Sequence, residues 1–220
     1  MTTRDGWPRY SPACRAAVQR LLRNGTSLTA YRSNPTHPLG PTEGSWAWKF
    51  EQLAERQAKV KHVIACSSGT MALVAALRAG ADEWFNCAIT SPFTFSATIG
   101  AIIHAGMFPT FADVTLDPVG CLDPMLVAQA DGDCVVPVDL FGAVADRRNG
   151  LPHRLVIADS CQAVGAYTEM RGAQAAVWSM NGQKNVPAGE AGAILTDDAD
   201  LACYVRRYIS HGENWRQLVE

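Results

Sequence analysis

The stretch HVIACSSGTMALVAALRA, residues 62–79, contains the pattern that decides the fold. Its first part, His62–Cys66, is a short apolar run with the length and composition of a buried strand. Its last part, Thr70–Ala79, is apolar nearly all round, which is typical of a buried helix. Between them, Ser67–Thr70 supplies the small polar residues that favour a helix N-terminus. The stretch therefore predicts one strand followed directly by one buried helix.

The same alternation continues toward the C-terminus. Short apolar runs follow one another, separated by segments of helical spacing or by turn residues. This order is typical of βαβ units and predicts an α/β fold, with a mostly parallel sheet and helices on both faces. The expected strands are His62–Cys66, Cys87–Ser91, Pro109–Val114, Cys134–Leu140, Leu155–Asp159, Ala175–Met180 and Ala193–Thr196, and the expected helices are Thr70–Ala79, Ser96–Ala105, Asp123–Ala130 and a final one that ends near His211.

The segment before this alternation has a different character. Ser11-Pro12 matches a helix N-cap followed by proline at the first helical position, and Gly25 is a stop signal, so a helix is expected between them. Residues 26–45 are rich in Pro, Gly, Ser and Thr and predict a long loop. A second helix is expected from Trp46 to about Lys59.

Composition argues against several classes of function. The net charge of −2 gives no electrostatic reason to expect nucleic acid or a membrane surface as a partner. No apolar run is long enough to span a bilayer, and the N-terminus lacks the apolar core of a signal peptide. The seven cysteines are scattered and form no CxxC pair, so we expect free thiols in a reducing cytoplasm and no metal site.

Polar residues gather where the expected strands end. Ligands of open α/β sheets bind at the carboxyl ends of the strands. Ser67–Thr70, Pro92–Phe95, Asp159–Gln162 and Ser179–Lys184 all lie at or just after such ends. The four segments are therefore expected to meet at one edge of the sheet.

Three of these features match the parts of a site for pyridoxal phosphate (PLP). Lys184 can form a Schiff base with the aldehyde, Asp159 can pair with the pyridinium nitrogen, and a helix that begins at Ser67–Thr70 can hold the phosphate. Each also has an ordinary alternative: a solvated surface lysine, a capping residue at a strand exit, and a plain N-cap. Together, the three favour PLP as the cofactor.

Three further residues are candidates for the same site. An aromatic ring such as Phe95 can stack on a planar cofactor, although packing in the core is an equal alternative. Gln162 can contact the ring or its hydroxyl, and Ser179 can add a hydroxyl to the phosphate. An ordinary polar contact is the alternative for Gln162.

In order and spacing, these segments resemble the DegT/StrS-type PLP-dependent sugar aminotransferases. The resemblance covers about residues 10–212. It is carried by Ser67–Leu73, Thr90–Thr98, Pro109–Val114, Val136–Gly142, Asp159–Gly165, Ser179–Asn185 and Gly189–Gly192.

The resemblance implies a type I PLP-dependent transferase fold and assigns each candidate a role. Lys184 becomes the internal-aldimine lysine, which also moves the proton between Cα of the donor and C4′ of the cofactor. Asp159 becomes the pyridinium partner, Gln162 a neighbour of the ring, and Phe95 the stacking aromatic. The phosphate-binding positions fall on Gly69, Thr70, Met71 and Ser179.

The resemblance also implies a reaction and an assembly. The amino donor would be glutamate or glutamine, and the acceptor a keto-sugar, most often nucleotide-linked. A related branch of the family carries His in place of the lysine and performs dehydration, so Lys184 favours transamination. Because the family shares its active sites across a dimer, a homodimer is expected.

The chain departs from the family in its length. Family members carry a further small domain, whereas this chain ends at Glu220, and its connections Asp117–Val135 and Asp146–Leu155 look short. We therefore expect residues 1–60 to hold the N-terminal helices and a substrate-side loop, and residues 61–220 to form a PLP-binding large domain without the small domain. This departure leaves an alternative function open, a PLP-binding but non-catalytic or partner-dependent subunit or sensor.

Overall fold

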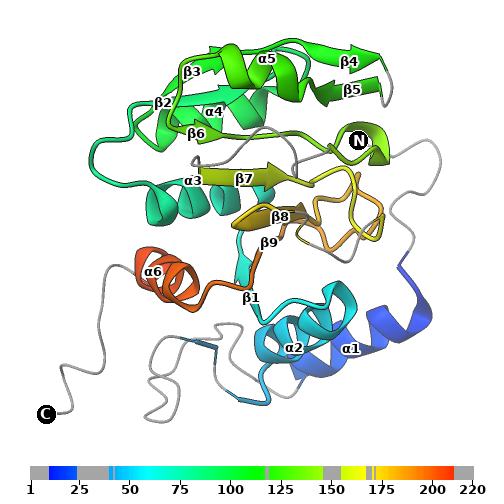
Figure 1. Cartoon of the computed structure of the whole chain (residues 1–220). Helices are drawn as coiled ribbons and strands as arrows, with labels where there is room; N and C mark the ends of the chain where they lie inside the picture. The colour runs from blue at the N-terminus through cyan, green and yellow to red at the C-terminus, as the bar shows by residue number, and fades with distance from the viewer. Residues whose placement is uncertain are drawn as a thin grey trace, which may run out of the picture.

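Figure 1 shows the computed structural model of the chain, which describes residues 10–23, 40–41, 43–116, 119–145, 155–166, 170 and 172–210. Its helices are α1 (Pro12–Arg23), α2 (Trp46–Ala58), α3 (Gly69–Gly80), α4 (Ser96–His104), α5 (Pro124–Gln129) and α6 (Ala199–Ile209), with a short 3-10 turn, η1 (Leu140–Gly142). Its strands are β1 (His62–Cys66), β2 (Cys87–Thr90), β3 (Phe108–Phe111), β4 (Val114–Leu116), β5 (Val119–Leu122), β6 (Cys134–Val135), β7 (Leu155–Asp159), β8 (Ala175–Ser179) and β9 (Gly192–Thr196).

The main sheet has seven strands in the order β1-β9-β8-β7-β6-β2-β3. The strands from β8 to β3 run parallel to one another, whereas β9 is antiparallel to both of its neighbours, β8 and β1. The expected α/β fold with a mostly parallel sheet is therefore confirmed. No helix among the described residues combines the length and the apolar character needed to cross a membrane.

Several strand ends meet at the side of this sheet where β7 and β8 finish. β7 ends at Asp159 and β8 ends at Ser179, while β9 begins there because it runs the other way. Gly192, the first residue of β9, pairs with Ser179 on one side and with Cys66, the end of β1, on the other. This edge also holds the start of α3, because α3 follows β1 almost directly.

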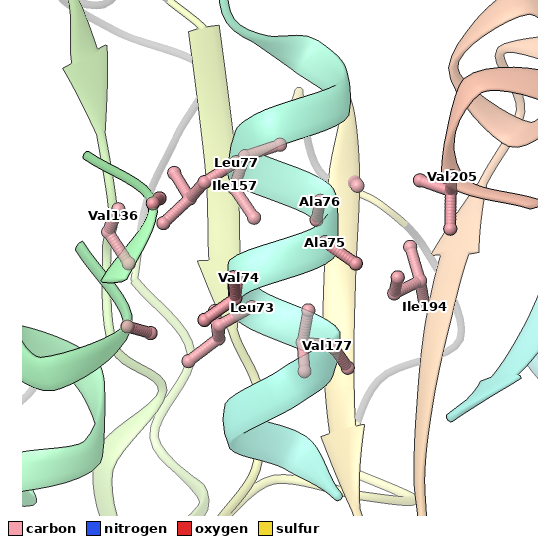
Figure 2. Packing of buried hydrophobic residues seen from close by; sticks show 14 of the residues in the cluster. Leu73, Val74, Ala75, Ala76, Leu77, Val136, Ile157, Val177, Ile194 and Val205 are labelled. Atoms are coloured by element: carbon pink, nitrogen blue, oxygen red, sulfur yellow. The ribbon is translucent and has the colours of Figure 1, made fainter. Parts of the chain in front are cut away.

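Helix α3 occupies the centre of the larger core. Its residues Ala72–Leu77 are all at most 3% exposed, as expected for a helix that is apolar nearly all round. Figure 2 shows this helix against Ile157 of β7, Val177 of β8 and Ile194 of β9, with Val205 of α6 beside it. The middle of the sheet and the start of α3 are thereby held in a fixed relation.

Helices cover both faces of the sheet, as expected. Successive strand residues point to opposite faces, and Val156, Ile157 and Ala158 of β7 accordingly belong to different apolar clusters. The cluster around Ile157 includes residues of α3, α4 and α6. The clusters on the opposite face include residues of α2 and α5.

The free edge of β1 is closed by side chains of α2 and α6. Glu51 and Glu55, one helical turn apart on α2, accept hydrogen bonds from the backbone N–H groups of Ala65 (2.9 Å) and Val63 (3.2 Å). Arg206 of α6 pairs with Glu51 at 2.9 Å and donates to the Val63 carbonyl at 3.1 Å. An exposed strand edge can pair with another chain, and these polar contacts occupy this one.

The structure differs from the sequence expectations at two connections. The strand expected over Cys134–Leu140 stops at Val135, and Pro137, which has no N–H, cannot donate to a neighbouring strand. The strand expected over Pro109–Val114 divides into β3 and β4, and β4 pairs with β5 in a small separate sheet that the sequence pattern did not indicate. Residues 26–39 of the expected loop 26–45, residues 146–154 of the connection expected to be short, and residues 211–220 lie outside the described residues.

Candidate cofactor site

A cavity of about 470 Å³ opens at the edge of the sheet where β7, β8 and β9 meet the start of α3. This size lies within the usual range for small-molecule sites. Its walls come from the α3 start, the segment before α4, the turn after β7 and the loop after β8. The lining residues are Ser68, Gly69, Thr70, Leu73, Thr94, Phe95, Ala97, Val138, Asp159, Cys161, Gln162, Ser179, Asn181, Gln183, Lys184 and Glu190.

The start of α3 packs very closely against the strand ends around it. Ser68 is the N-cap, and its hydroxyl accepts a hydrogen bond from the Met71 N–H at 3.2 Å. A Cβ at Gly69 would lie 2.8 Å from Cys161 Sγ and 2.8 Å from the Cβ of Ser179. A Cβ at Gly192 would collide with the Ser68 carbonyl group. Two glycines therefore allow the end of β8 and the start of β9 to press against the N-terminus of α3.

This helix end can bind an anion. The first N–H groups of an α-helix have no partner within the helix, and the helix dipole adds partial positive charge there. Gly69 and Thr70 begin α3 and line the cavity, and the Ser179 side chain lies beside them. The arrangement suits a phosphate group.

Asp159 is a buried carboxylate with a defined orientation. Only 6% of the residue is exposed, yet it lines the cavity. Its Oδ2 accepts a hydrogen bond from Thr98 Oγ1 at 2.7 Å, and its Oδ1 accepts one from the Cys161 N–H at 3.1 Å. Because a carboxylate can accept about four hydrogen bonds, it retains capacity for a cationic N–H inside the cavity.

Lys184 lies in the loop that connects β8 to β9. Backbone hydrogen bonds from Lys184 to the Asn181 carbonyl (2.9 Å) and from Ala188 to the Met180 carbonyl (2.8 Å) give this loop a fixed path. The Asn181 side chain strengthens it by accepting from the Gln183 N–H and donating to Glu190. The loop thereby holds Lys184 at the cavity that also contains Asp159.

A second cavity of about 340 Å³ lies beside the first and shares Lys184 and Gln162 with it. Phe141 is part of its wall and adopts a left-handed conformation (φ 55°, ψ 23°), which is rare for a bulky residue. The Phe141 N–H donates to Gln162 Oε1 at 3.1 Å. That bond identifies the oxygen of the Gln162 amide and leaves its NH₂ group as a donor.

Exposed aromatic rings stand near these cavities. Phe95 lines the larger one and is 66% exposed. Phe141 is 74% exposed, and its ring contacts Phe93 edge to face at 6.3 Å between centroids. Apolar rings in contact with solvent at a cavity are available to a planar ligand.

Cys161 places a thiol in the cavity wall, and this thiol stays protonated and unreactive. Burial, followed by the nearby Asp159 carboxylate, raises the pKa of Cys161 well above its usual value, although the Lys184 charge acts in the opposite direction. A thiolate is the nucleophilic form of cysteine, so Cys161 remains a neutral packing group. Among the described residues, no cluster of three or more His, Cys, Asp or Glu side chains is arranged to hold a metal ion.

The structure brings together all but one of the residues expected at the site. Met71 does not line the cavity, its side chain is 47% exposed, and its N–H is already bonded to Ser68. The residues found at the same cavity are Gly69, Thr70, Phe95, Asp159, Gln162, Ser179 and Lys184.

Sequence reasoning did not identify Thr94, Thr98 or Glu190 as parts of the site. The sequence could have indicated Thr98, because a polar residue in a mostly apolar helix needs a hydrogen-bond partner when it is buried. Glu190 lies in a Gly-rich loop, where its polarity alone predicts only exposure.

Comparison with known proteins assigns the family. A model of the DegT/DnrJ/EryC1/StrS aminotransferase family matches residues 40–220. The chain belongs to this family. It is a family of sugar aminotransferases that use PLP. All the segments that carried the resemblance, except Pro109–Val114, contribute residues to the cavity.

Relatives share the sequence at about 30% identity. The chain is 35% identical over 186 residues to the pleiotropic regulatory protein of Geobacillus stearothermophilus, covering 77% of this chain and 49% of the relative. It is 31% identical over 226 residues to L-glutamine:2-deoxy-scyllo-inosose aminotransferase of Streptomyces lividus, covering 94% of this chain and 50% of the relative. The chain thus spans about half the length of the curated relatives it matches.

A solved structure extends the likeness to three dimensions. Helicobacter pylori PseC, an aminotransferase involved in the biosynthesis of pseudoaminic acid, matches with a TM-score of 0.79 and 25% identity. The match covers 94% of this chain and 55% of that one. The large-domain fold expected from the sequence is therefore the one that the structure has.

Proposed function

We propose that this chain is a PLP-dependent aminotransferase that transfers an amino group from glutamate or glutamine to a keto-sugar. The observation that carries the proposal is the position of Lys184, Asp159 and the start of α3 on one cavity. PLP needs a lysine, an acidic partner and a phosphate site at the same time.

The described residues fit PLP in size and in chemistry. The cavity of about 470 Å³ has room for a small aromatic phosphate. Asp159 is buried and is only partly supplied with hydrogen-bond donors, so a protonated ring nitrogen suits it. The start of α3 offers backbone N–H groups for the phosphate. The glycines at 69 and 192 carry no Cβ, which would collide with the neighbouring atoms of this segment.

When bound, PLP supplies an aldehyde for amino-group chemistry and a ring that stabilises carbanionic charge. Lys184 would attach the cofactor and then transfer a proton at the donor's Cα. Asp159 would keep the ring nitrogen protonated, and Phe95 would cover one face of the ring. Gln162 would donate to the ring hydroxyl through its NH₂ group, because its oxygen is occupied by Phe141. Gly69, Thr70 and Ser179 would hold the phosphate.

The name of one relative supports the choice of amino donor. The Streptomyces lividus relative is named L-glutamine:2-deoxy-scyllo-inosose aminotransferase, which supports glutamine or glutamate as the donor. We propose a nucleotide-linked keto-sugar as the acceptor, and a cytoplasmic homodimer as the assembly. The division at residue 60 and the role of residues 26–45 on the substrate side belong to the same proposal.

Covalent trapping tests the proposal. PLP is added to the purified chain, borohydride is used to fix it to its lysine, and the modified peptide is identified by mass spectrometry. Modification at Lys184, with none in Lys184→Ala and full modification in the exposed control Lys61→Ala, is expected. Glutamate should then convert bound PLP to its amine form before borohydride is added. Trapping at another lysine, or no trapping at all, contradicts the proposal.

A second candidate is a PLP-binding but non-catalytic or partner-dependent subunit or sensor. The name of the Geobacillus relative, a pleiotropic regulatory protein, favours it. It predicts that borohydride traps PLP on Lys184 and that glutamate leaves the bound cofactor unchanged. Conversion of the cofactor by glutamate in the isolated chain excludes it.

A further inference from the structure

Thr98 forms the hydrogen bond that fixes the side chain of Asp159. It belongs to the first turn of α4, is 1% exposed, and does not line the cavity. Its hydroxyl lies 2.7 Å from Asp159 Oδ2, although the two residues are 61 positions apart in the chain. A threonine in a helix commonly bonds to a carbonyl of its own helix, whereas this one reaches across to the end of β7.

A second hydroxyl continues this contact to the cavity wall. Thr94 lines the cavity, and its Oγ1 lies 2.8 Å from Thr98 Oγ1. A threonine hydroxyl has one proton. Because Thr98 donates that proton to the carboxylate, the Thr94 hydroxyl must be the donor to Thr98. The order of donation is therefore Thr94 to Thr98 to Asp159.

The hydrogen bonds that hold the main chain of Asp159 do not involve its carboxylate, which therefore depends on other groups for its orientation. The main chain of Asp159 is held by hydrogen bonds to the Pro137 carbonyl and from the Asp139 N–H, both 2.9 Å. The two carboxylate oxygens accept hydrogen bonds from the Thr98 hydroxyl and the Cys161 N–H, and the Cys161 thiol also bonds to this side chain. A catalytic carboxylate has to be held closely in its working orientation by surrounding hydrogen bonds.

We infer that Thr98 is a positioning residue for Asp159, and that the Thr94 hydroxyl supports it from the cavity wall. The inference rests on the proposed function, because it concerns the carboxylate that would pair with the PLP ring nitrogen. It adds to that function a residue outside the cavity that sets the strength of the pairing. If Thr98 served folding alone, its loss would change PLP affinity no more than the loss of a buried threonine hydroxyl far from the site.

Affinity for PLP, measured without the covalent link, tests the inference. Titration of the Lys184→Ala protein with PLP, followed by tryptophan fluorescence or equilibrium dialysis, gives a dissociation constant free of Schiff-base chemistry. Addition of Thr98→Val, which removes the hydroxyl at equal volume, is expected to weaken binding on the order of tenfold. Thr98→Ser keeps the hydroxyl and should restore affinity to within a factor of about two.

A matched control separates positioning from general damage. Thr196 is also buried, and its hydroxyl bonds to the Gln174 carbonyl at the opposite end of β9. Thr196→Val should lower the melting temperature of the ligand-free protein without changing PLP affinity. If Thr98→Val and Thr196→Val lower PLP affinity equally, the effect is one of folding and the inference is overturned.

A double-mutant cycle with Asp159 supplies the decisive comparison. If Thr98 acts through Asp159, then Thr98→Val should have no further effect on PLP affinity once Asp159→Asn is present. An equal loss of PLP affinity with and without Asp159→Asn overturns the inference, while the proposed function stands because the Lys184→Ala protein still binds PLP. If neither the Lys184→Ala protein nor the wild-type chain binds PLP, the proposed function is overturned, and the inference with it.

Discussion

Replacing Gly192 by alanine should damage the fold and the candidate site together. The new Cβ would fall on the carbonyl group of Ser68 and 2.7 Å from the backbone nitrogen of Gly69. Both neighbours are backbone atoms of the segment that begins α3, so no side-chain rotation can relieve the contact. Either β9 or the N-terminus of α3 has to move.

The size of the effect follows from the packing around this contact. Gly192 pairs with Ser179 and Cys66 in the sheet, and Ala72–Leu77 of α3 are at most 3% exposed. Overpacking a rigid core costs about 1–3 kcal/mol, and a backbone contact belongs at the upper end. A loss of about 3 kcal/mol corresponds to a fall of roughly 6–12 °C in melting temperature for a chain of this size.

Thermal and urea unfolding of the ligand-free protein measure this loss, and PLP titration measures the accompanying loss of affinity. Gly100→Ala is the control, because Gly100 lies inside α4 and a Cβ there meets nothing within 4 Å. It should gain about 0.5–1 kcal/mol from helix propensity. A Gly192→Ala protein with wild-type stability and PLP affinity would refute the argument that these two backbones define the site.

Two further predictions concern buried ionisable groups. Glu51→Gln leaves Arg206 without its anionic partner beside β1, and should lower the free energy of unfolding by roughly 3–5 kcal/mol in urea; an unchanged urea midpoint would show that the pair contributes nothing. Burial raises the pKa of Cys66 and of Cys134 from 9.0 to about 12, so between these values the unfolded chain releases protons that the folded chain retains. Stability should therefore fall as pH rises above about 9, and Cys134→Ala should reduce that slope; an equal slope in the variant would contradict the argument.

The fold class and most strand positions could be predicted because they depend on local pattern. Short apolar runs that alternate with helical segments are specified by nearby residues, and β1, α3 and β7 lie close to their expected bounds. The strand expected over Cys134–Leu140 ends early, at Val135, for a local reason, the proline at 137. The hairpin β4-β5 was missed because its strands are short and irregular.

The candidate site was predictable to the extent that it lies at strand ends. Asp159 and Ser179 end neighbouring strands, and Lys184 follows in the next loop, so the order of the strands brings them to one edge. The family resemblance assigned Met71 to the phosphate with them; in the structure its N–H donates to the Ser68 hydroxyl, and it does not line the cavity.

By itself, the sequence determined the apolar faces, the strand ends and the identities of the chemical groups, because each depends on residues close together in the chain. Only the tertiary structure decided that β9 runs antiparallel and places Gly192 against Ser68. It alone decided that Thr98 reaches Asp159 and that Phe141 takes a left-handed conformation beside Gln162. These features depend on contacts between distant segments, whose geometry is set by the packing of the whole sheet and cannot be read from local spacing.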